Sequence, residues 1–100
     1  MLKHVNKDNF ESEVINNKEI VIADFFAVWC GPCQMLTPVL EKVAEKVDVA
    51  KIDIDESEEL AIKYGIEVVP TLIFFKNGEI KKEVAGFHSE KELLEIIEKI

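Results

Sequence analysis

Apolar residues gather in short runs along the chain, and the spacing of each run predicts a secondary structure. Residues 20–26 are apolar almost throughout, which is typical of a strand buried on both faces, as in a parallel sheet. Residues 36–47 repeat apolar positions at helical spacing, and Pro38 inside this pattern predicts a kink. Residues 49–54 predict a second strand. The three segments therefore form a βαβ unit with a right-handed crossover.

Shorter elements lie before and after this unit. Residues 2–5 are a candidate strand, and Asn6 is placed to cap a helix that would follow it. Farther along, Asp55 or Ser57 begins another short helix, and Gly65 is placed to end it in a left-handed conformation. These segments continue the alternation of strands and helices.

The last third of the chain predicts a hairpin and a final helix. Residues 71–76 and 79–85 are strand candidates joined by Asn77-Gly78, a dipeptide that favours the tight turns of hairpins. Lysines in the second strand suit the edge of a sheet. Ser89 and the glutamate three residues later are spaced as a capping box. The whole order, βαβαβαββα, predicts one α/β domain over residues 1–100, with helices on both faces of a mixed sheet.

Composition and charge exclude several classes of function. The chain has 100 residues, a net charge of -8 and no arginine, whereas a nucleic-acid surface needs clustered positive side chains. We therefore expect no nucleic-acid partner. No segment approaches the ~18 apolar residues that would span a membrane. The first eight residues lack the apolar run of a secretory signal, so we expect a cytoplasmic protein.

Both cysteines of the chain lie in Trp29-Cys30-Gly31-Pro32-Cys33, where the buried strand gives way to the helix. The first turn of a helix has free backbone N–H groups and partial positive charge, which stabilise a thiolate and lower the thiol pKa. Two intervening residues bring the second sulfur into attacking range once the helix forms. The spacing and its setting therefore predict a redox-active cysteine pair.

Two other uses of the cysteines stay open at this point. Cysteine is often a small buried hydrophobic residue, so the pair could serve packing alone. A zinc site needs four ligands, and only His4 and His88 remain as neutral candidates, at opposite ends of the chain. Because these histidines have no local ligand spacing, we expect no metal site.

The pentapeptide around the cysteines, together with Val69-Pro70-Thr71, resembles the thioredoxin family. The resemblance covers essentially the whole chain and includes residues 24–27, 64–66, 75–78 and Gly86. Two positions depart from the family pattern. Phe26 stands where many members carry a second tryptophan, and Gln34 stands where a lysine often follows the second cysteine.

The resemblance implies a thioredoxin fold and a protein disulfide reductase with no cofactor beyond its own Cys30–Cys33 disulfide. A thioredoxin reductase would supply electrons, disulfide-containing target proteins would receive them, and the chain would act as a monomer. Two rival functions remain. A secretory oxidase or isomerase is disfavoured by the absent signal and by Gly-Pro between the cysteines; a non-catalytic protein-binding module would use the same apolar face.

We expect Cys30 to be the nucleophile, because it lies just outside the first helical turn where solvent can reach it. Cys33, inside the helix, is then the resolving thiol that attacks Cys30 to release the target. Gly31 and Pro32 shape the turn between them, since proline fixes φ and lacks an N–H where a helix begins. Trp29 is expected to shield the sulfurs and contact the target, although packing in the core is an equally good interpretation.

The rest of the expected substrate face follows from the resemblance. A cis peptide bond before Pro70 would leave the Val69 backbone free to pair with an extended target segment. The expected face consists of Trp29, Ile66, Val69, Pro70, Gly86 and Phe87. For Ile66 and Phe87, packing in the core is the favoured alternative.

Asp24 is the most unusual residue outside the cysteine motif, because an acid inside an apolar run is costly when it is charged and unpaired. Desolvation would raise its pKa above the ordinary value of ~3.9. With Lys51 on the neighbouring strand, it would move protons for Cys33. The alternatives are a solvated strand end for Asp24 and a surface position for Lys51.

Overall fold

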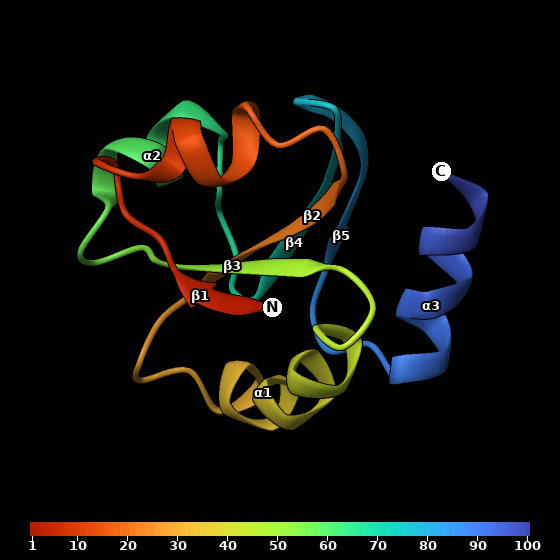
Figure 1. Ribbon diagram of the computed structural model, residues 1–100. Helices are drawn as coiled ribbons and strands as arrows, with labels where there is room; N and C mark the ends of the chain where they lie inside the picture. The colour runs from red at the N-terminus through yellow and green to blue at the C-terminus, as the bar shows by residue number, and fades with distance from the viewer.

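The computed structural model describes all 100 residues, and a five-stranded sheet runs through its centre (Figure 1). Its strands, in chain order, are β1 (Leu2–His4), β2 (Ile20–Phe26), β3 (Asp48–Asp53), β4 (Thr71–Lys76) and β5 (Glu79–Ala85). In space the order is β1-β3-β2-β4-β5. Strand β3 is parallel to β1 and β2, whereas β4 is antiparallel to β2 and β5. The predicted mixed sheet is therefore confirmed.

Helices cover both faces of this sheet, as the element order predicts. They are η1 (Glu11–Ile15), α1 (Gly31–Val43), α2 (Glu58–Lys63) and α3 (Glu90–Lys99). In Figure 1, α1 and α3 lie on one side of the strands, with α2 and the orange-red η1 on the other. Because side chains alternate along a strand, Phe25 of β2 packs in one core with Leu60 of α2, whereas Ile22 packs in the other with Leu36 of α1. This double burial explains the continuous apolar run of β2.

The hairpin turn, the glycine after α2 and the capping box of α3 are present as the sequence predicts. Asn77 and Gly78 join β4 to β5 with φ values of 54° and 78°, the left-handed values that tight hairpin turns require. The Ser89 hydroxyl accepts a hydrogen bond from the Glu92 N–H, and the Glu92 carboxylate accepts one from the Ser89 N–H. Gly65 follows α2 with a φ of 65°. The residue types at these positions therefore match the local conformations that they adopt.

The first helix does not begin where the sequence predicts. Asn6 does not cap it: the Asn6 side chain accepts a hydrogen bond from the Asp8 N–H, and the Asn6 N–H donates to the Asn9 side chain. Short polar side chains of this kind compete with helical bonds and favour turns. The helical segment runs from Glu11 to Ile15, and it is a π-helix.

Helix α1 is shorter than its apolar spacing predicts, because it ends at Val43 instead of Val47. Beyond Val43, the N–H groups of Glu45 and Lys46 donate to carbonyls three residues back, which tightens the chain into turns. Val47 remains half-buried against the core beside α1. The apolar character of Val47 therefore reflects its burial and does not indicate that the helix continues.

Candidate active site

The two cysteines lie where β2 passes into α1. Cys30 is the N-cap of α1, with a φ of -92° and a ψ of 115°, and its Sγ accepts a hydrogen bond from the Cys33 N–H at 3.2 Å. Pro32 lies in the first turn, where its missing N–H leaves no helical bond unmade. The two sulfurs form a disulfide, with the Cα atoms 5.3 Å apart. The helix thus directs a backbone donor at the Cys30 sulfur, which is where a thiolate would be stabilised.

Both sulfurs are covered by protein. Cys30 is only 5% exposed and Cys33 3%, so the expectation that solvent reaches Cys30 is wrong for the disulfide form. The cover comes in part from the loop before β4. Val69 packs against a small cluster of Phe26, Ala27 and the two cysteines, and its carbonyl oxygen lies 3.7 Å from Cys30 Sγ. Cys30 is therefore the cysteine whose sulfur meets this loop.

The loop before β4 contains a cis peptide bond between Val69 and Pro70, as the family resemblance implies. The Pro70 carbonyl accepts a hydrogen bond from the Gly86 N–H at 2.8 Å, and the Thr71 hydroxyl donates to the Val68 carbonyl at 2.7 Å. These bonds fix the chain on both sides of Val69, whose own N–H and carbonyl make no backbone hydrogen bond. The loop therefore holds unused backbone groups beside Cys30.

The side chains of the expected substrate face differ in exposure. Trp29 is 67% exposed, so its interpretation as a core residue is wrong, and its Nε1–H donates to Asp55 Oδ2 at 2.9 Å. Phe87 is 47% exposed, which makes the favoured core interpretation wrong there too. Ile66, by contrast, is half-buried against the core that contains Phe25, as the core interpretation requires.

Sequence reasoning missed two exposed apolar neighbours of this face. Val28 is 64% exposed and precedes Trp29; Val68 is 56% exposed and precedes Val69. Both lie outside the helices and strands. A β-branched apolar residue in a loop, next to a residue already singled out, is the signal that could have identified them.

Asp24 lies in the middle of β2 with 1% of its surface exposed, so a solvated strand end is excluded. Parallel pairing places it beside Lys51 of β3, which is 6% exposed and is therefore not a surface lysine. Lys51 Nζ lies 3.6 Å from Asp24 Oδ2, and Asp24 Oδ1 has no hydrogen-bond partner. Burial raises the pKa of Asp24 to about 6, against the opposing attraction of the Lys51 ammonium.

A cavity of about 220 Å³ has both Lys51 and Cys33 in its wall. Its other lining residues are Phe26, Ala27, Val28, Gln34 and Thr37. The cavity is large enough for water, and Gln34, Thr37 and Lys51 supply polar groups in its wall. The ammonium beside Asp24 and the second cysteine therefore share one cavity.

Comparison with known proteins agrees with this geometry. The sequence model of the Thioredoxin family matches residues 1–99. The chain belongs to the thioredoxin family. It is 44% identical to the thioredoxin of Rickettsia bellii, over 97% of this chain and 96% of that protein. It is 41% identical to the thioredoxin of Staphylococcus epidermidis, over 95% of this chain and 93% of that protein.

A solved structure shows the same architecture. A mutant thioredoxin from Halobacterium salinarum NRC-1 has a TM-score of 0.90 and 45% sequence identity, covering 98% of this chain and 88% of that chain. The mixed sheet with flanking helices is thus the thioredoxin fold. The chain is a thiol-disulfide oxidoreductase with protein disulfide reductase activity, and Cys30 and Cys33 are its redox pair.

The two departures from the thioredoxin pattern lie beside the redox pair. Gln34 Nε2 donates to the Val28 carbonyl at 2.9 Å, which ties the first turn of α1 to the loop before the cysteines. Phe26 receives the Lys51 ammonium over its ring, 4.4 Å from the centroid, and meets the His4 ring edge-on. These residues therefore hold the active-site loop and the buried lysine.

The zinc alternative finds no support in the side-chain arrangement. No three His, Cys, Asp or Glu residues form a group that could hold a metal ion. His88 Nδ1 lies 3.1 Å from the Gly86 carbonyl oxygen. No helix in the structure combines the length and apolar composition that crossing a bilayer requires.

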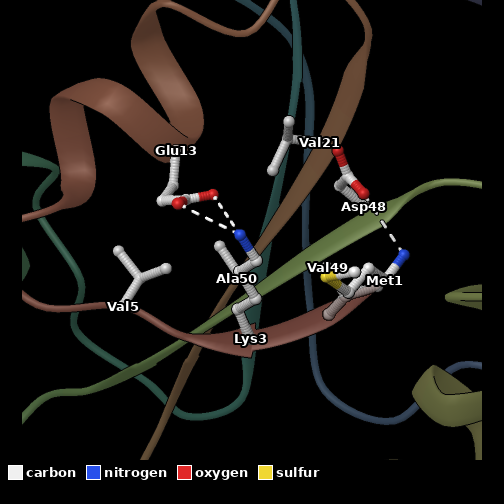
Figure 2. Close-up of a pocket in the computed structure, with 8 residues that line it drawn as sticks. All are labelled: Met1, Lys3, Val5, Glu13, Val21, Asp48, Val49 and Ala50. Atoms are coloured by element: carbon white, nitrogen blue, oxygen red, sulfur yellow. Dashed lines mark hydrogen bonds and ion pairs between the residues drawn. The ribbon is translucent and has the colours of Figure 1, made fainter.

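A separate pocket of about 260 Å³ opens at the other end of the sheet (Figure 2). Met1, Val21 and Asp48 line it and lie where β1, β2 and β3 begin, whereas the cysteines follow the end of β2. Its charges are already paired. Lys3 Nζ donates to both Glu13 carboxylate oxygens at 3.1 Å, and Asp48 Oδ1 lies 3.2 Å from the Met1 amino group. Dashed lines in Figure 2 mark these contacts. This pocket is not part of the redox site.

Proposed function

We propose that this chain passes two electrons from its reduced cysteine pair to disulfides of target proteins, with Cys30 as the nucleophile and Cys33 as the resolving thiol. The observation that carries the assignment is the position of the Cys30 sulfur. It accepts a hydrogen bond from the Cys33 N–H at the helix start and faces the Val69 carbonyl. The N–H favours a Cys30 thiolate, and the loop brings an incoming target to the same sulfur.

The reaction proceeds in two exchanges. The Cys30 thiolate attacks one sulfur of the target disulfide, which forms a mixed disulfide and releases the other target sulfur as a thiolate. Cys33 then loses its proton and attacks the Cys30 sulfur, so the Cys30–Cys33 bond forms and the second target sulfur leaves as a thiolate. The target gains two electrons and takes up protons to become a dithiol. The chain ends as the disulfide seen in the structure.

Target binding uses backbone groups and apolar side chains together. The unused N–H and carbonyl of Val69 suit β-type hydrogen bonds with an extended target segment. The proposed face comprises Trp29, Ile66, Val69, Pro70, Gly86 and Phe87, and the exposed Val28 and Val68 extend it. Backbone pairing requires no particular side chain in the target, so one face can accept different target sequences.

Asp24 and Lys51 control the proton of Cys33 in this proposal. A carboxyl group with a pKa of about 6 accepts a proton effectively near neutral pH, as a general base must. The cavity that Lys51 and Cys33 share offers room for water to carry the proton.

The proposal extends to partners and compartment. A thioredoxin reductase returns electrons to the disulfide, and proteins with exposed disulfides are the targets, as family membership implies. Residues 1–100 act as a single domain and as a monomer. Because a disulfide reductase needs surroundings that keep thiols reduced, the cytoplasm is the proposed compartment.

Serine variants of the two cysteines test these roles. With NADPH, a thioredoxin reductase and insulin, Cys30→Ser is expected to abolish insulin reduction. Cys33→Ser should stop at a mixed disulfide, which peptide mass spectrometry would locate on Cys30. The wild-type protein, which releases its target, is the control. An adduct on Cys33 in the first variant, with none on Cys30 in the second, would reverse the assignment.

A further inference from the structure

The hydroxyl group of Thr37 lies between the buried lysine and the second cysteine. Thr37 is one turn after Cys33 on α1 and lines the cavity that contains Lys51. Lys51 Nζ lies 3.1 Å from Thr37 Oγ1, closer than the 3.6 Å that separates it from Asp24 Oδ2. Thr37 Oγ1 also lies 3.3 Å from the Cys33 carbonyl oxygen. The nearest polar partner of the ammonium is therefore Thr37, not Asp24.

The chemistry of these groups determines the direction of both hydrogen bonds. An ammonium has three donors and no acceptor, so Thr37 Oγ1 accepts from Lys51. A carbonyl oxygen only accepts, so the single hydroxyl proton goes to Cys33. Both bonds form together, because a hydroxyl has one donor and two lone pairs. The Thr37 hydroxyl is thereby held against the backbone of α1, and it holds the Lys51 ammonium in place.

We propose that Thr37 is a positioning residue of the redox reaction: its hydroxyl holds the Lys51 ammonium back from Asp24 and so keeps that carboxyl able to take the Cys33 proton near neutral pH. The inference rests on the proposed role of Asp24 as proton acceptor. At 3.6 Å the ion pair is longer than the ~2.8 Å of a charge-assisted hydrogen bond, and Asp24 Oδ1 has no partner at all. A closer ammonium would favour the carboxylate and make it a weaker base.

Few other groups on this face can control Asp24. The titratable groups that the packed elements present here are His4 of β1, Cys33 of α1, and Lys51 and Asp53 of β3, whereas the β4 partner is Leu72. His4 is exposed, and the Asp53 carboxylate accepts backbone N–H groups of the following turn. Lys51 is thus the charge whose position controls Asp24, and Thr37 sets the position of Lys51.

Thr37→Val tests the inference, because valine removes the hydroxyl and keeps the side-chain shape. The ammonium then loses its nearest acceptor and moves toward Asp24. Closing the nitrogen–oxygen distance from 3.6 Å to ~2.8 Å, at an effective dielectric constant of ~20, lowers the pKa of Asp24 by about one unit. We expect this shift in the ¹³C NMR titration of the Asp24 carboxyl in the oxidised protein. The pH midpoint of the resolving step, measured in single-turnover target release, should fall equally.

Two matched variants are measured together with Thr37→Val. Thr37→Ala, a second hydroxyl-free variant, should shift both midpoints in the same direction, whereas Thr37→Ser keeps the hydroxyl and should reproduce the wild-type values. An Asp24 titration that is the same in wild type, Thr37→Val and Thr37→Ala refutes the inference. A serine variant that shifts as far as valine refutes it as well, because the effect would then not come from the hydroxyl.

Asp24→Asn separates this inference from the proposed function. Loss of the pH dependence of target release in this variant supports Asp24 as the proton acceptor. If the pH dependence persists, Asp24 is not the acceptor, and the catalytic part of the inference fails together with that role. The NMR titration of the Thr37 variants reports independently on whether Thr37 controls the Asp24 carboxyl.

Discussion

Replacing Asp24 with asparagine should make the protein more stable at neutral pH, because the wild-type carboxylate is charged inside the sheet. Burial raises the pKa of Asp24 from 3.8 to about 6, so the folded protein holds this proton more tightly than the unfolded chain does. The stability linked to the proton is complete below the unfolded pKa and is lost as pH rises through the folded value. Above pH 6, the ionised carboxyl therefore lowers the free energy of unfolding.

The difference between the two pKa values sets the size of the effect. The rise of the Asp24 pKa from 3.8 to about 6 corresponds to about 3 kcal/mol of unfolding free energy at pH 7. Asparagine resembles the protonated carboxyl group of Asp24. With either of these uncharged neighbours the Lys51 ammonium has no ion pair, so this free-energy difference already includes the loss of the ion pair. The free energy of unfolding of Asp24→Asn should therefore exceed that of the wild type by about 3 kcal/mol at pH 7 and by only about 0.5 kcal/mol at pH 4.

Urea unfolding of the oxidised wild type and Asp24→Asn, at several pH values between about 4 and 7, measures these free energies. Asp8→Asn is the matched control, because Asp8 is exposed and the variant loses the same charge. It should change stability by less than about 0.5 kcal/mol at each pH. The reasoning is refuted if Asp24→Asn is less stable than wild type at pH 7, since the carboxylate would then gain more from Lys51 than its burial costs. If the resolving step is also unchanged, Asp24 is a structural ion-pair partner only.

Two further predictions concern backbone positions and one concerns a helix cap, and the same unfolding measurement checks all three. Gly65→Ala should cost about 1 kcal/mol, because an alanine there must adopt a positive φ. Gly78→Ala should cost at least about 1 kcal/mol more, because its Cβ would also lie 2.5 Å from the Ile15 carbonyl oxygen; equal losses would contradict this close approach. Ser89→Ala should cost about 1 kcal/mol, because the Glu92 N–H loses its acceptor, and an unchanged stability would show that the cap contributes nothing.

Most of the fold could be predicted because local and tertiary preferences agree there. The bounds of β2 match its apolar run, since both of its faces are covered. The predictions fail where two interactions compete for the same residues. At Asn6, side-chain hydrogen bonds to nearby N–H groups replace a helix cap. Val47 is apolar because it packs against the core, and its position happens to continue the helical spacing. The chain has already left the helix and entered turns at this point.

The site could be predicted only in part, because a sequence motif identifies residues but does not specify what surrounds them in the fold. Spacing identified the cysteines, and the apolar run around Asp24 indicated its burial. The burial of Lys51 depends on the register of β2 against β3, which no local pattern specifies. The contact of Thr37 with Lys51 depends further on the direction in which α1 packs across that pair. Trp29 and Phe87 are exposed because they lie in loops, where apolar character alone does not decide burial.

The buried pair of Asp24 and Lys51 is difficult to explain as a stabilising feature. Removing two charges from water is repaid only by close geometry and full hydrogen bonding, yet these groups lie 3.6 Å apart and Asp24 Oδ1 has no partner. Apolar residues of similar volume would fit beside Ile22 and Leu72, which are fully buried on the same face. A chain selected for stability alone would therefore favour such residues. In the proposed mechanism, the position of Lys51 in the cavity wall that also contains Cys33 gives the pair a chemical reason, because release of the target needs a group beside Cys33 that exchanges protons near neutral pH.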